Sequence, residues 1–114
     1  MPAIRAASLY AACVLAFSLT LPLAAHAQSF NCRYAKTPDE VAICQSTYLS
    51  SLDQRMSTLY FRVRNRLNTG ARFRLEAQQS RVLQERRGCG ADRECIAEVY
   101  RRRIEDLEQY DVGG

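Results

Sequence analysis

The residues with the clearest chemical potential in this 114-residue sequence are its cysteines. Cys89 and Cys95 enclose the charged segment GADRE, and Cys32 and Cys44 form a second, wider pair. Cysteines bind zinc, take part in thiol redox chemistry or form structural disulfides. Zinc sites favour C-x-x-C pairs or histidines and redox centres favour C-x-x-C, whereas the spacings here are C-x5-C and C-x11-C. Which chemistry applies depends on the compartment that the chain reaches.

Residues 1–27 have the pattern of a secretory signal peptide. Arg5 supplies a positive charge, an uncharged apolar run follows, and the tripeptide AHA at 25–27 fits the small-x-small cleavage rule. An uncleaved membrane anchor is one alternative, because the apolar run has about the 20 residues that cross a bilayer. Lipidation at Cys13 is another. The pattern favours cleavage, export to the periplasm or the extracellular space, and no stable membrane span in the mature chain, residues 28–114.

The mature chain retains four cysteines and no histidine. An even number of cysteines in a small exported chain indicates a disulfide framework. Four cysteines allow three pairings, and the sequence alone does not choose among them. We expect Cys32–Cys44 and Cys89–Cys95, because each pair lies within one unit of turn plus helix. The sequence contains no cluster of residues typical of a metal site and no glycine-rich phosphate loop. We therefore expect neither a metal nor a cofactor.

Catalytic constellations are missing from the mature sequence. A serine or cysteine nucleophile needs a neighbouring base, and the usual base, histidine, does not occur after residue 27. Glu98, Glu105 and Glu108 recur at helical spacing with Arg101, which is typical of ion pairs on a solvated helix face. The triplet 101–103 is interpreted in the same way, as a compensated surface charge run. We therefore expect a binding protein and not an enzyme.

Two helices are predicted in the first half of the mature chain. Thr37 and Glu40 form a capping box with a proline between them, and this short helix should end near 45–47. Apolar residues at spacings of three and four then predict an amphipathic helix of about five turns. Gly70 is its expected C-cap. The apolar positions of the second helix are Leu49, Leu52, Met56, Leu59, Val63 and Leu67.

Two further helices are predicted in the second half. One covers residues 71–87 with Gly88 as its C-cap, and Asp92 caps the next, which ends before Gly113. No segment alternates with a period of two, and the connections are short. We therefore expect an all-α fold, a small antiparallel helical bundle of three to four helices stapled by two disulfides. The apolar faces comprise Leu75, Val82 and Leu83, with Ala71 and Phe73 added, and Ile96, Val99, Tyr100, Ile104 and Leu107.

The order of motifs along the mature chain is similar to that of a known family. The motifs are FNC at 30–32, PxExxIC at 38–44, LxxLDxxMxxxY at 49–60, QxxxLxER at 79–86, CGADxxC at 89–95 and YxxRIxxL at 100–107. This pattern resembles LprI-like domains, small exported bacterial domains named after a mycobacterial lysozyme inhibitor. Members commonly carry tryptophan at the position of Val82 and aspartate at that of Arg87. The resemblance implies an all-α, disulfide-stapled exported domain and, as an expected activity, lysozyme inhibition.

The loop closed by Cys89 and Cys95 offers the first candidate for binding a partner. Lysozymes cleave glycosidic bonds with two carboxylates in a cleft, and a rigid loop that projects an arginine suits such a cleft. Arg93 is the candidate side chain, with Asp92 and Arg87 beside it. The expected partner is a lysozyme or another exported protein, whose cleft the loop occludes.

A second candidate surface lies on the predicted helix over residues 48–67. Arg55, Arg62 and Arg66 fall close together in helical projection, and no acid on the same helix faces them. One interpretation is that the aliphatic parts of these side chains cover the edge of the apolar core. The other is that the arginines form a strip that binds an anionic envelope polymer. This gives the alternative function, an envelope-associated binding module or an accessory subunit without inhibitory activity. Export excludes nucleic acid as a partner.

Asp53, Arg86 and Tyr60 are expected to have structural polar roles. Asp53 lies at the edge of the apolar stripe of its helix, close in projection to Tyr60. A partly buried carboxylate persists only with a partner, such as Arg86 or the N–H groups of a helix end.

Overall fold

The computed structural model describes residues 29–113 and contains four α-helices and one 3-10 turn, with no strand in this range. The elements are η3 (Cys32–Tyr34), α1 (Pro38–Cys44), α2 (Thr47–Arg64), α3 (Thr69–Gly88) and α4 (Arg93–Gly113). The predicted all-α bundle is confirmed. None of these described helices is long and apolar enough to cross a membrane. The expected signal peptide, residues 1–27, lies outside the described residues.

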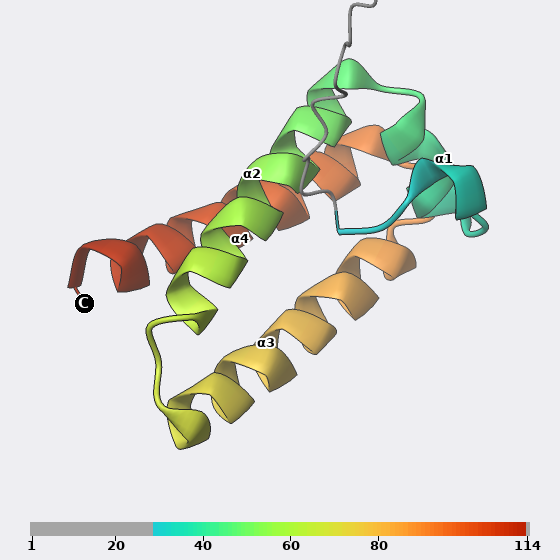
Figure 1. The fold of residues 1–114 in the computed structure, drawn as a ribbon. Coiled ribbons are helices and arrows are strands. Elements are labelled where there is room, and N and C mark those ends of the chain that lie inside the picture. Colours follow the sequence, from blue (N-terminus) through green and yellow to red (C-terminus); the bar gives the residue numbers. More distant parts are fainter. Residues whose placement is uncertain (1–28, 114) are drawn as a thin grey trace, which may run out of the picture.

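Consecutive long helices are antiparallel, so α2 and α4 run in the same direction (Figure 1). Tyr100 on α4 contacts Asp53 on α2 near their starts, and Asp111 contacts Arg66 near their ends. These two helices share the most extensive contact in the fold. Helix α1 packs at the end where α4 begins, while α3 diverges from the α2–α4 pair along its length (Figure 1). The bundle is therefore a tight helix pair with a third helix splayed to one side.

The core is built mainly from α2 and α4, as their apolar spacing predicts. All five apolar positions predicted for the last helix are buried, whereas α3 contributes Leu75 as its only buried apolar side chain. Phe73 is 71% exposed, so its predicted place on the apolar face of α3 is wrong. The buried apolar cluster comprises Ala42, Ile43, Leu49, Met56, Leu59, Val63, Leu75, Ile96, Ala97, Tyr100, Ile104 and Leu107.

Three predicted helix ends are wrong, and the simplest case is α4, which includes Gly113 instead of ending before it. Helix α2 ends at Arg64, and Gly70 is inside α3 instead of capping α2, because Asn68 begins the next helix. The Asn68 side chain accepts a hydrogen bond from the Ala71 N–H at 2.9 Å, which is the N-cap geometry. At the other end of α3, Gly88 is the last helical residue. The residue there with a positive φ is Gly90 (φ 61°), which only glycine adopts readily.

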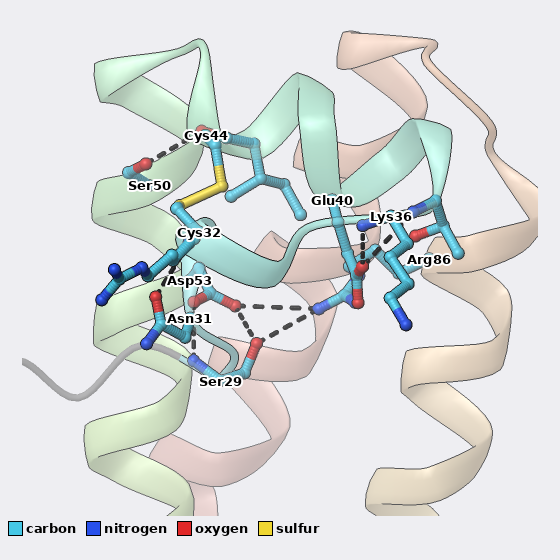
Figure 2. The surroundings of a disulfide bond; sticks show 12 residues. Ser29, Asn31, Cys32, Lys36, Glu40, Cys44, Ser50, Asp53 and Arg86 are labelled. Carbon is cyan, nitrogen blue, oxygen red and sulfur yellow. Dashed lines mark hydrogen bonds and ion pairs between the residues drawn. A yellow bond between two sulfur atoms is a disulfide. The ribbon is translucent and has the colours of Figure 1, made fainter.

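Both predicted disulfides are confirmed. Cys32–Cys44 joins η3 to the last turn of α1, with 5.8 Å between its Cα atoms (Figure 2). Cys89–Cys95 closes the turn between α3 and α4, with a Cα distance of 5.6 Å. The two bonds therefore secure the irregular segments that precede α1 and α4.

Candidate functional site

The turn between α3 and α4 is held in shape on both sides of Arg93. The Cys89–Cys95 bond closes it, and Gly90 supplies the left-handed bend. The Asp92 side chain accepts a hydrogen bond from the Cys95 N–H at 3.0 Å, which confirms that Asp92 caps α4. Arg93 is thus presented by a backbone that has little freedom left to lose on binding.

Arg93 is exposed, and no hydrogen bond or ion pair engages its guanidinium within residues 29–113. Its acidic neighbours are occupied elsewhere, since Asp92 caps α4 and Glu94 accepts from Arg101 at 2.7 Å. Arg93 and the exposed Lys36 line the same shallow hollow of about 470 Å³. This end of the bundle therefore presents two cations around a depression.

Of the partner-binding residues predicted at this turn, Arg87 does not line the hollow. Arg87 is exposed in the last turn of α3. Val41, in α1, lines the same hollow as Arg93 and is 39% exposed. The hollow thus combines charge with an apolar patch, a composition found where proteins bind each other.

The predicted arginine strip, formed by Arg55 and Arg62 of α2 and by Arg66 in the turn that follows, is paired with acids of α4. Arg62 contacts Asp111 at 3.1 Å, and Arg66 contacts the same carboxylate. Arg55 pairs with Glu108. The prediction of an uncompensated arginine strip considered only the acidic residues of the same helix. The acidic partners come instead from α4, which packs against α2. Because these charges are compensated, the strip offers less attraction to an anionic polymer than its sequence indicates.

A buried polar network surrounds Arg86 (Figure 2). Its Nε donates to Asp39 at 2.8 Å, and Nη1 donates to Ser29 Oγ at 3.2 Å. The Tyr100 hydroxyl donates to Asp53 at 2.8 Å, and the Ser29 N–H donates to the other oxygen of Asp53, also at 2.8 Å. Asp39 and Asp53 are completely buried, and Arg86 is 3% exposed. The network ties the N-terminal segment, α1, α2, α3 and α4 together.

The ionisation of this network follows from its burial and its partners. Burial favours the neutral form of Asp39, but the nearby Thr37 hydroxyl and Arg86 outweigh it, so the pKa of Asp39 lies below its ordinary value. Burial opposes the charge on Arg86, yet contacts with Tyr100 and Asp39 raise its pKa overall. Burial raises the pKa of Tyr100, and the Asp53 carboxylate adds to the effect. Asp39 and Arg86 are therefore a charged pair at neutral pH, and Tyr100 is a neutral donor.

The free energy of unfolding is expected to decrease as the pH falls. Because the folded-state pKa of Asp39 is depressed, its contribution is fully present above the unfolded pKa of about 4 and is lost as the pH falls through the folded value. Glu40 acts in the same direction, since the Lys36 N–H lowers its pKa. Urea denaturation at neutral pH and at about pH 3 measures the loss. Asp39→Asn should show a smaller loss than the unmodified protein, and an equal loss would contradict this origin.

Tyr60 does not join the network around Asp53. It lies half-buried on α2 with its ring edge-on to Phe61 (centroids 5.0 Å apart), and burial with the nearby Glu76 raises its pKa. The tyrosine that donates a hydrogen bond to Asp53 is Tyr100. The sequence pattern places Tyr100 only on the apolar face of its helix. Helical projection placed Tyr60 near Asp53, but it did not show which helix faces Asp53.

Arg103 contradicts the interpretation of residues 101–103 as one surface charge run. Arg101 and Arg102 do pair with surface carboxylates, but Arg103 is 4% exposed. Its Nε donates to Gln79 Oε1 at 2.9 Å, and the Gln79 amide in turn lies 3.7 Å from the sulfur of Met56. A signal was available, because Arg103 follows Tyr100 by three residues and therefore lies on the buried face of α4.

The fold and these sites together define a small all-α protein, with two disulfides, two buried polar clusters and a cationic, disulfide-closed turn. No cluster of histidine, cysteine or acidic side chains suited to a metal ion occurs in the described part of the chain. Comparison of the chain with protein-family models, curated proteins and solved structures gives no match.

Proposed function

We propose that this protein is an exported, LprI-like binding protein that inhibits a lysozyme by inserting Arg93 into the catalytic cleft. The observation that carries the proposal is that the Arg93 guanidinium is exposed and has no partner within residues 29–113, on a turn closed by a disulfide. Two disulfides in a small domain support export, because such bonds persist in oxidising compartments.

The chemistry of the cleft suits a guanidinium. Lysozymes place two carboxylates on either side of the scissile bond, and a planar guanidinium pairs with a carboxylate through two parallel hydrogen bonds. An arginine in that position blocks the sugar from both carboxylates. Lys36 on the same hollow offers a second cation for the acidic walls of the cleft, and the exposed part of Val41 offers apolar contact.

Long-range attraction contributes little to this association. Removal of Arg5 with the signal peptide lowers the formal net charge from +4 to +3, and a cationic lysozyme would repel such a molecule at a distance. Binding must therefore come from local complementarity, for which a rigid turn is well suited because little entropy is lost on contact. An acidic or neutral lysozyme is the better target on this argument.

Inhibition assays with a panel of lysozymes test the proposal. The protein, purified after export with its disulfides formed, should inhibit at least one lysozyme, and Arg93→Glu should weaken that inhibition by at least about tenfold. The matched control is Arg74→Glu, which reverses the charge of another exposed arginine that has no ion pair within residues 29–113. Far-UV circular dichroism verifies that both variants are folded. No inhibition at large molar excess, or equal weakening by both substitutions, would overturn the proposal.

A further inference from the structure

Helix α3 diverges from the helix pair (Figure 1). A groove of about 580 Å³ lies between α3 and α4. Its floor is formed by Arg103, which is 4% exposed, and by the half-buried Val82. Its walls are polar and exposed, and they include Arg81, Glu85 and Asp106. The groove therefore has a buried cation at its base and charges of both signs at its rim.

Arg103 lacks a full set of acceptors. Its Nε donates to Gln79, but Nη2 is buried and has no acceptor within residues 29–113. Asp106, one turn further along α4, acts on Arg103 electrostatically but forms no hydrogen bond or ion pair with it. Buried polar groups in folded proteins nearly always have partners, and an unpaired buried donor is costly. Arg103 lines the groove, but Nη2 is covered by protein atoms, so an incoming acceptor pairs with it after a shift of the Arg103 side chain toward the groove.

We infer that this groove binds a small sugar acid, with the ligand carboxylate on Arg103. A carboxylate supplies the two acceptor oxygens that a guanidinium holds best. The walls supply the Gln109 amide and the Tyr110 hydroxyl, which donate and accept, and so they match the neutral hydroxyl groups of a sugar ring.

The rim charges set the selectivity of the groove. Asp106 repels a second negative charge, and Glu85, which is paired with Arg102 at 3.6 Å, adds to this effect more weakly, so a ligand with one carboxylate is favoured over a more highly charged anion such as phosphate. Arg81 stands on the same rim without an ion pair in the described part of the chain and offers a secondary contact to the carboxylate. A polar, singly charged ligand fits this arrangement.

This site is independent of the proposed lysozyme contact. Arg103 lies ten residues after Arg93 on α4, which corresponds to about 15 Å along the helix. Substitutions at one position should therefore leave the other function intact, and the failure of either proposal is recognised separately.

Isothermal titration calorimetry with three probes tests the inference. Glucuronate should bind measurably, whereas glucuronamide, its uncharged analogue, and inorganic phosphate should bind at least about tenfold more weakly. Arg103→Met should abolish glucuronate binding, and Arg74→Gln, outside the groove, should leave it unchanged. No heat with glucuronate, or equal binding of glucuronate and glucuronamide, would overturn the assignment.

Two rim variants keep the test decisive if Arg103→Met fails to fold. Asp106→Asn removes a repelling charge from an exposed position and should tighten glucuronate binding by about two- to fivefold. Arg81→Gln should weaken it by a similar factor. If neither substitution changes the affinity, the ligand does not occupy this groove and the inference is wrong.

Discussion

Replacing Arg86 by methionine is expected to lower the free energy of unfolding by about 3–5 kcal/mol. Methionine fills a similar volume but leaves Asp39 without its ion-pair partner, and it removes the Nη1 donor from Ser29 and Tyr100. Asp39 and Asp53 are completely buried, so water cannot replace the lost interactions. A domain of this size has a total stability of about 5–10 kcal/mol, and the variant is therefore close to unfolding at room temperature.

Urea denaturation followed by circular dichroism measures this effect. Arg87→Met is the matched control, because Arg87 is the next residue in α3 but is exposed, and we expect it to change the stability by less than about 0.5 kcal/mol. The double variant Arg86→Met/Asp39→Asn should be less destabilised than the sum of its single changes, since the orphaned charge is removed. Similar midpoints for the Arg86 and Arg87 variants would show that the network adds little to stability.

Loss of both disulfides is expected to have an effect of comparable size. Cys32–Cys44 closes a sequence separation of 12 residues and Cys89–Cys95 one of 6. In the chain-entropy model, these loops correspond to about 3 and about 2 kcal/mol of stabilisation. Together they approach the whole stability of a small domain, so reduction under native conditions should cause loss of most of the helical circular dichroism signal.

Paired serine substitutions separate the two bonds. Cys32→Ser/Cys44→Ser should lower the melting temperature more than Cys89→Ser/Cys95→Ser, because the first bond closes the longer loop and fixes the segment that bears Ser29. Under the proposed function, the second pair of substitutions should also weaken lysozyme inhibition, since it frees the turn that presents Arg93. The reverse order of melting temperatures would contradict the chain-entropy argument.

The apolar core of α2 and α4 was predictable because it depends on local periodicity. Leu49, Met56 and Val63 recur at helical spacing, and all three are buried. In α3 the same spacing carries polar side chains, since Gln79 and Arg86 lie on the stripe that Leu75 begins. Periodicity identifies the face of a helix that is buried, but an analysis of apolar residues alone overlooks polar members of that face.

The candidate sites depended more strongly on contacts between helices. The compensation of Arg55, Arg62 and Arg66 comes from Glu108 and Asp111. These residues are distant in sequence, and projection on a single helix cannot bring them together. The same holds for Tyr100 and Asp53, which meet because α2 and α4 run in the same direction.

The sequence by itself determined the all-α class and the capped start of α4, and it favoured the two disulfide pairs and the exposed position of Arg93, because each depends on residues close together in the chain. Only the tertiary structure decided the partners of Arg86, the burial of Arg103 and the groove between α3 and α4. These features depend on how helices cross and diverge. Helix packing is the sum of many weak contacts between distant residues, and no local pattern encodes that sum.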